Sequence, residues 1–524
     1  MNADRSKKTL GWTMALGAAL LLGCGEAPPT TASTPVPSGT EAMTTSPTGP
    51  ARVLLEQPSE DAPQVDRCGA LTESNDRCGP IAELFPDVPG DVCDPGLPGW
   101  EPSQNAMDHL SWRTLVALLW PAKPGAPGVP DPAARPGARI DDKVSRPAVF
   151  ETWSSPDDLL ALAAQLDEGE VLGPADWGAA APSPGACPGG SGLRILHHVG
   201  KVAPATADAL RGTPAAAAAG GPVVDQNGRL LFVETRFNRT MWDVITAGGY
   251  YRADTSRDGL VFPNNLGDTG YRQGAIAVQA AWALLTDAAA ASGQYHVSAV
   301  LLHQRGTEER MGSCDKQLVG LVGLAIAHKA TSGGEHWVWS AFDHKDAAPD
   351  SEAPLPQEYF LSSNGCLGAD TSMCAKAPTP AGEAWACCPN HDLYGPLGPA
   401  DHVLADRTPT QIALVDPGTD RSSCGERYAQ ALAGTPVAHF RLEGTQWWAN
   451  READTLEYGV VPRSLRVAAL QPWAVAPQTG GGQRTTSSCI GCHAAGADSV
   501  FLLSSLASAP AGTAGPSEAP SDPE

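Results

Sequence analysis

The sequence predicts an α+β fold, with one large mixed globular domain over residues 67–508. Apolar residues alternate with other residues over 276–284 and 295–301, which is the pattern of strands. Leucines recur at helical spacing over 107–120, which predicts a helix with one apolar face. The chain of 524 residues can bury a large core, and its sequence contains no repeat of solenoid type.

Two helices are predicted in the first third of the chain. The helix over 107–120 ends at Pro121, which cannot continue it. The second begins after Ser155, a residue suited to a helix cap, and has Pro156 and two acidic residues in its first turn. Between the two helices, residues 149–153 have the composition of a short strand.

Further strands are predicted in the middle and last thirds. Asn227-Gly228 predicts a tight turn between strands at 223–224 and 230–233. Residues 318–327 are almost wholly apolar and include two glycines, so a buried strand and a closely packed helix both fit. Strands are also predicted at 337–342 and 437–447, on either side of a cysteine-rich insertion at 366–388.

The first residues predict export and a lipid anchor. Basic residues precede an apolar stretch that is too short to span a bilayer as a mature helix. Leu21-Leu22-Gly23-Cys24 then matches the cleavage site of bacterial lipoproteins, so we expect a signal peptide over 1–23 and an acylated Cys24. An ordinary cleaved signal with an incidental cysteine is the alternative. The lipid would hold the protein to a membrane, facing the periplasm.

The stretches outside the domain have the composition of disordered chain. Residues 24–66 are rich in Pro, Thr, Ser and Ala and contain few large apolar residues. Residues 509–524 have the same character. We therefore expect a flexible tether between the lipid and the domain, and a loose tail after it.

Five residues near the C-terminus, Cys489-Ile490-Gly491-Cys492-His493, match the attachment motif of a c-type haem. The two thiols add to the two vinyl groups of a haem, and the adjacent histidine becomes the proximal iron ligand. A thioredoxin-type dithiol would follow a strand, whereas a run of glycines precedes this motif. A zinc site would need a second ligand pair at short spacing. We expect one covalent haem c, held by Cys489, Cys492 and His493.

Charge and cysteine content agree with this interpretation. After Cys24 and the two motif cysteines, ten of the 13 cysteines remain, an even number that suits up to five disulfides in an oxidising compartment. The net charge of −23 argues against nucleic acid and anionic lipid as partners. It suits a basic redox partner protein, although a solvated acidic surface that keeps the protein soluble explains it equally well.

Several stretches of the chain, between Trp112 and Leu503, resemble a family of large bacterial proteins described as "cytochrome c family protein". The similar stretches are 112–121, 150–153, 225–228, 237–239, 274–276, 280–282, 320–324, 328–329, 337–340, 342–344, 444–447 and 488–493. The resemblance implies a monohaem c-type protein, here in a lipoprotein form, and implies no substrate. The sequence departs from the family pattern at Ala325, where a histidine is frequent, and over 465–473.

The sixth position of the iron is open in the sequence, because neither methionine nor histidine follows His493. A ligand must come from upstream, or the position stays vacant. His328 is the first candidate for a distal iron ligand, since it ends a strongly apolar segment. The others are His344, His439, Met241 and Met311. For each of them, a structural role in the core is the competing interpretation.

These observations predict a lipid-anchored, periplasm-facing monohaem c-type cytochrome that transfers electrons. A haem enzyme of peroxidase type, or a haem-based ligand sensor, is the alternative if the sixth position is vacant. A domain of more than 400 residues is larger than a simple electron carrier needs. The rest of the domain must therefore bind something, shape a site or dock a partner.

Overall fold

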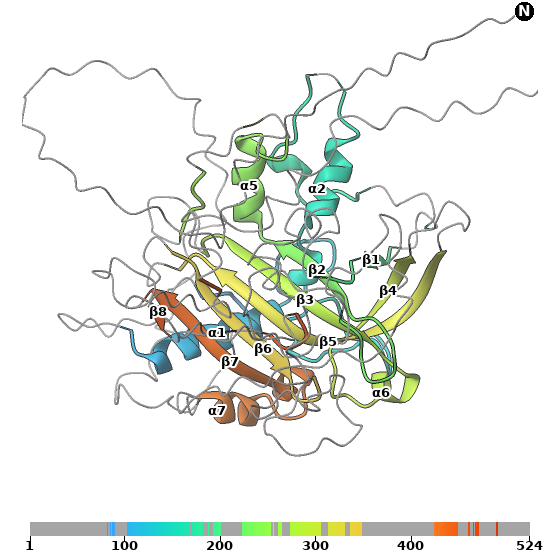
Figure 1. Cartoon of the computed structure of the whole chain (residues 1–524), viewed down its shortest axis with the longest axis vertical. Helices are drawn as coiled ribbons and strands as arrows, with labels where there is room; N and C mark the ends of the chain where they lie inside the picture. The colour runs from blue at the N-terminus through green and yellow to red at the C-terminus, as the bar shows by residue number, and fades with distance from the viewer. Residues whose placement is uncertain are drawn as a thin grey trace, which may run out of the picture.

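The computed structural model describes residues 102–181, 192–200, 223–252, 260–264, 273–304, 313–330, 336–347 and 424–448, with short gaps, and isolated positions including 187, 465, 467–470 and 489–490. In this part of the chain, helices surround one large sheet (Figure 1). The mixture of helices and sheet expected from the sequence is therefore confirmed.

Eight strands form the sheet, in the order β1-β4-β5-β6-β7-β8, while β3 pairs with β5 and β2 with β3. All pairs are antiparallel except the parallel pair β1–β4. The strands are β1 Arg194–Leu196, β2 Phe232–Phe237, β3 Ile276–Leu284, β4 Val297–Gln304, β5 Ser313–His328, β6 Val338–His344, β7 Phe440–Trp448 and β8 Val460–Val461.

The long strand β5 organises the sheet (Figure 1). Its first half pairs with β4, its second half pairs with β6, and β3 pairs along the other edge. Residues 318–327 therefore form a strand, which decides the question that their apolar composition left open. A strand that is covered on both faces has no polar face, so its sequence shows no alternation.

Alternate residues of β5 enter two different cores. Leu324 and Ile326 belong to a cluster that contains Trp112 and Leu115 of α1 (Gln104–Leu118), and we call this side of the sheet the α1 face. The opposite side, the α5 face, packs on α5 (Arg239–Ala247) through residues such as Ala325 and Ala327. From Leu324 to His328, the face that a residue of β5 occupies therefore follows from its position in the strand.

The two predicted helices are confirmed. Ser103 caps α1, which ends at Leu118, shortly before Pro121. Ser155 caps α2 (Pro156–Ala163) in a capping box with Asp158, and Pro156 is the first helical residue. The remaining helices are α6 Asp287–Ala291 and α7 Cys424–Ala431, with the 3-10 turns η1 Phe150–Thr152, η2 Pro174–Asp176 and η6 Pro436–His439.

The strand predicted at residues 149–153 is wrong, because this stretch forms the 3-10 turn η1. The turn is fixed by Glu151, whose carboxylate accepts a hydrogen bond from the amide of Ala148 at 3.0 Å and pairs with Arg194. Tertiary contacts of one charged side chain thus override the strand preference of its neighbours.

Two other predictions are right in part. Residues 223–233 make the expected turn, with Gly228 at φ +70° and a bridge between Val224 and Leu230, but the regular strand begins only at Phe232. The strand predicted over 437–447 begins at Phe440, because Pro436 starts a 3-10 turn before it.

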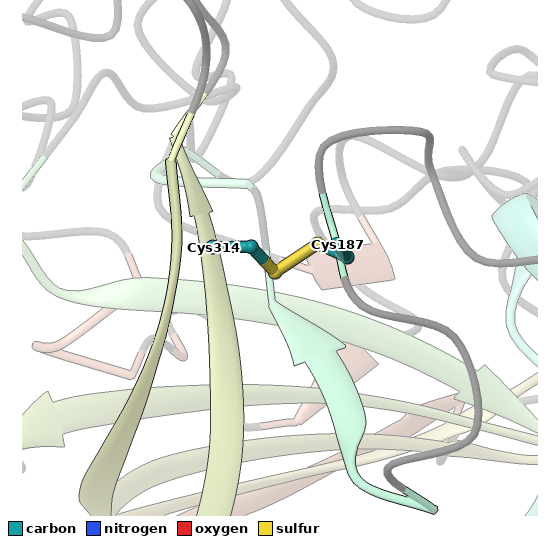
Figure 2. Close-up of a disulfide and its surroundings, with 2 residues drawn as sticks. All are labelled: Cys187 and Cys314. Carbon is teal, nitrogen blue, oxygen red and sulfur yellow. A yellow bond between two sulfur atoms is a disulfide. The ribbon is translucent and has the colours of Figure 1, made fainter.

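Cys187 and Cys314 form a disulfide that joins the stretch before β1 to the start of β5 (Figure 2). The predicted signal peptide over 1–23, the tether over 24–66 with Cys24, the insertion over 366–388 and the tail over 509–524 lie outside the described residues.

Candidate haem-attachment site

The structure describes the first two residues of the Cys-x-x-Cys-His motif, and Cys492 and His493 lie outside the described residues. Ile490 is buried in the core of the α5 face. Its amide donates a hydrogen bond to Oε1 of Gln446, a buried residue of β7, at 2.9 Å. This bond fixes the position of the motif backbone on the sheet.

Cys489 is half-buried beside the same core and has a thiol rather than half of a disulfide. The thiol donates to the carbonyl oxygen of Leu465 at 3.8 Å. Thioether formation with a haem vinyl group requires a thiol, so the described half of the motif has the chemistry that covalent attachment needs.

Residues 465 and 467–470, which we call the 465–470 segment, pack on the sheet's α5 face, and the carbonyl oxygen of Leu465 also contacts the motif. The close approach of this segment depends on Gly323 of β5, where an added Cβ would lie 2.7 Å from Val467 Cγ1 and 2.9 Å from Ala469 Cβ. The segment is also held by β6, because Asp343 Oδ2 accepts a hydrogen bond from the amide of Ala468 at 2.9 Å. Two neighbouring strands, β5 and β6, thus hold this segment by close packing and by a hydrogen bond.

Tryptophans gather where β6 begins and β7 ends. Trp337, Trp339 and Trp448 all pack on the α5-face core that also contains Ile490. His336 stacks on Trp448, with ring centroids 4.5 Å apart and planes inclined by 19°. Lys329 places its ammonium group 5.5 Å from the ring centroid of Trp337. Broad aromatic surfaces of this kind suit contact with a flat apolar macrocycle.

His328, the first candidate for the distal ligand, lies on the other face. It follows Leu324 and Ile326 at alternate positions of β5, and its partner across the sheet is Val338, which packs on Met107 and Leu110 of α1. Its Nε2 donates to the carbonyl oxygen of Gln273 at 2.7 Å. The structure does not bring His328 to the face that holds Cys489.

His344 and His439 are also on the α1 side. His344 is fully buried: Nε2 donates to the carbonyl oxygen of Gln294 at 3.2 Å, and Nδ1 accepts from the amide of Asp346 at 3.1 Å. It stacks between Tyr295 and His439, at centroid distances of 4.5 and 5.8 Å. Burial lowers the pKa of His344 to about 4. These contacts give His344 a structural role.

The two methionine candidates are placed differently. Met241 is fully buried in α5, within the core of the α5 face. Met311 lies outside the described residues.

A buried ionic network on the α1 face was not anticipated from the sequence. Arg194 of β1 contacts both Glu151 and Glu234, and His296 contacts Glu151. Arg236 completes it, 3.0 Å from Glu234. Burial alone would raise the pKa of the Glu151 carboxyl, but Arg194 and His296 outweigh burial and hold that pKa well below its usual range.

This network joins η1 to β1, β2 and the start of β4. Each of its carboxylates contacts a cation, and Trp282 Nε1 also donates to Glu234 at 2.9 Å. Such mutual pairing is typical of a structural network. The sequence signal for it was weak, because the four charged residues and His296 come from separate segments and share no motif.

No protein-family model, no curated protein and no solved structure matches this chain. The search for a group of three or more His, Cys, Asp or Glu side chains that could hold a metal ion found none among the described residues. In the same part of the chain, every helix is too short or too polar to cross a membrane.

Proposed function

We propose that this chain is a lipid-anchored monohaem c-type cytochrome that faces the periplasm and transfers electrons. The observation that carries the proposal is the sequence Cys489-Ile490-Gly491-Cys492-His493, in which two thiols and a histidine have the spacing of covalent haem attachment. The half-buried Cys489 thiol and its aromatic and aliphatic surroundings support it.

The bound haem would supply a one-electron iron couple. The protein's own residues have three tasks. Cys489 and Cys492 fix the orientation of the porphyrin, and His493 binds the iron from the proximal side. The bond from Ile490 to Gln446 anchors this short peptide to β7. The apolar α5 face keeps water from one side of the site, and such exclusion of water tunes the redox potential of a metal centre.

Export is part of the proposal. The lipoprotein signal peptide that precedes Cys24 would deliver the chain to the compartment where disulfides persist. The Cys187–Cys314 disulfide is consistent with that destination. The acidic chain would favour a basic redox partner and disfavour nucleic acid.

Covalent haem is tested by the mass of denatured protein purified from a bacterial host that matures c-type cytochromes. We expect one porphyrin retained on the wild-type chain, and none on the Cys489→Ser, Cys492→Ser double variant. The Cys187→Ser, Cys314→Ser double variant is the matched control, since it also removes two cysteines but should keep the porphyrin. Wild-type protein without retained porphyrin would refute the proposal.

Electron transfer is separated from the alternative by the absorption spectrum of the holo-protein. A carrier should have low-spin bands that cyanide and carbon monoxide leave unchanged. High-spin bands that shift with these ligands would instead indicate a peroxidase-like enzyme or a ligand sensor with a vacant distal position.

The lipid anchor has its own test. Cys24→Ser should release the protein from the membrane fraction into the soluble periplasmic fraction. A variant that still sediments with membranes would contradict lipidation at Cys24.

A further inference from the structure

We propose that Asn227 is a modification site, at which the side-chain carboxamide is lost spontaneously whenever the turn of residues 225–229 opens. In the folded protein, the buried carboxylate of Asp225 holds this turn closed and so protects Asn227. The inference goes beyond the proposed function and needs no haem. It is carried by the hydrogen bonds that the described residues of the turn make.

The chemistry is general for an asparagine that precedes glycine. The main-chain nitrogen of Gly228 attacks Cγ of Asn227, and the new bond closes an imide ring. The carboxamide nitrogen leaves as ammonia and takes the proton of the Gly228 amide. Water then opens the ring at either carbonyl group and gives aspartate or isoaspartate. Water is consumed and ammonia is released, so the step needs no oxidant or reductant.

The two reacting groups are adjacent and unobstructed. Asn227 is exposed, and the described residues make no hydrogen bond to its carboxamide. Gly228 has no Cβ to shield its nitrogen, and it lies at φ +70°, a conformation that glycine adopts readily. Asn238 is different, because it is buried, donates to the carbonyl oxygen of Gly274 at 2.8 Å and precedes the bulky Arg239.

The closed turn opposes the attack. The Gly228 amide donates to the carbonyl oxygen of Asp225 at 3.0 Å. To react, this amide must lose its proton, which breaks the hydrogen bond. The amide of Asp225 in turn donates to the carbonyl oxygen of Arg229 at 2.7 Å, which closes the other side of the loop. The reaction must therefore start from an open turn.

The side chain of Asp225 strengthens the closure. Its Oδ1 accepts hydrogen bonds from the amides of Asn227 and Arg229, each at 2.8 Å, and its Oδ2 accepts from Arg229 Nε at 3.2 Å. Asp225 is fully buried, and hydrogen bonds to a charged group are the strong ones. One carboxylate thus joins the middle and the end of the loop that contains Asn227.

The modification would leave a lasting mark on the fold. Isoaspartate lengthens the main chain of the loop by one methylene group. Val224 and Leu230, which pair across the turn and belong to the core of the α1 face, would no longer be held in register. The product therefore records that the turn has opened, and it makes further opening easier.

The rate of reaction at Asn227 can be measured on the purified full chain. The protein is incubated at neutral pH in water labelled with heavy oxygen, either folded or in guanidinium chloride, and is then digested in ordinary water for peptide mapping by mass spectrometry. We expect the folded chain to incorporate the label at Asn227 at least about tenfold more slowly than the denatured chain, because the turn must first open locally.

Asp225→Ala tests the role of the carboxylate. In the folded protein it should accelerate the reaction about tenfold or more, since it removes strong hydrogen bonds, whereas in denaturant its rate should equal that of wild type. Asp141→Ala is the matched control. Asp141 Oδ1 likewise accepts from the amides of Lys143 and Val144, but in another turn, so Asn227 should react as in wild type.

Asp225→Asn decides if Asp225→Ala does not fold, because it keeps an acceptor oxygen and loses only the charge. It should accelerate the reaction of the folded chain by a smaller factor. Equal rates in folded and denatured wild type would overturn the inference, as would a denatured chain that does not react at Asn227. So would an unchanged rate in the folded Asp225 variants, or an equal acceleration in Asp141→Ala.

Discussion

Gly323 allows residues 467–470 to pack closely against β5. Gly323→Ala would place a Cβ within 2.9 Å of both Val467 and Ala469. We expect the free energy of unfolding to fall by about 1–3 kcal/mol, because a close-packed contact has no room for a methyl group. Urea denaturation of purified protein measures the change.

Gly425→Ala is the matched control for Gly323→Ala. The new Cβ would lie 3.8 Å from the Trp112 ring, which is ordinary contact, and alanine suits the helix α7 better than glycine does. Stability should be unchanged or slightly higher. An equal loss in both variants would show that crowding against the 465–470 segment is not the cause.

His344 should make stability depend on pH. Burial lowers its pKa to about 4, whereas a histidine in the unfolded chain has a pKa near 6.5. Between these values the unfolded chain binds more protons than the folded chain, so stability is complete above about pH 6.5 and falls as the pH approaches 4. The contribution is as much as about 3 kcal/mol.

The pH effect is measured as the free energy of unfolding at pH 7 and at pH 4.5, for wild type and His344→Gln. The variant loses packing at both pH values, but its stability should change less between them. If the difference in the free energy of unfolding between wild type and variant did not change with pH, His344 would not be the group that causes the pH dependence. His109, whose pKa burial and then Arg113 lower to about 4, contributes equally to both proteins.

Single residues also differ in how far the sequence predicts their place in the site. The motif from Cys489 to His493 is visible in the sequence, because adjacent residues carry its chemistry. The side of the sheet on which His328 lies is not, because residues 318–327 of β5 are apolar on both faces and show no alternation.

At the scale of single elements, the start of α2 offers a clean test. Ser155 Oγ accepts from the amide of Asp158 at 3.0 Å, and Asp158 accepts from the amide of Ser155 at 2.9 Å. Ser155→Ala should lower the free energy of unfolding by about 1 kcal/mol, as loss of a helix cap does. Ser155→Asn keeps a capping oxygen and should remain close to wild type in the same urea titration. Equal losses would argue against capping.

Elements were predicted well where local chemistry decides them. The capped start of α2 and the Asn227-Gly228 turn are both local, and both are found. The strand predicted at residues 149–153 does not form, because Glu151 pairs with Arg194, which comes more than 40 residues later. Sequence windows cannot detect such a partner, whereas the folded chain depends on it.

At the scale of the whole molecule, the Cys187–Cys314 disulfide should stabilise the fold. It closes a loop with a sequence separation of 127, which restricts the unfolded chain strongly. Replacing both cysteines by alanine should lower the free energy of unfolding by about 2–5 kcal/mol. Wild-type protein unfolded under reducing conditions should lose at least as much, because the reductant also opens any other disulfide. If only the variant loses stability, the bond is not formed in solution.

The topology was beyond prediction from the sequence, for a physical reason. Which strands pair depends on contacts between distant segments, such as β5 with β3, β4 and β6, and strand patterns do not encode partners. The fold class could be predicted, because it depends only on the spacing of apolar residues within single segments.

Two hydrogen bonds join the described part of the C-terminal segment to the sheet through its main chain. The donors are the amides of Ala468 and Ile490, and the acceptors are the side chains of Asp343 and Gln446. Every amino acid except proline has that amide. Substitutions at these two positions should therefore leave the hydrogen bonds in place, so that what they change is the packing of the side chain.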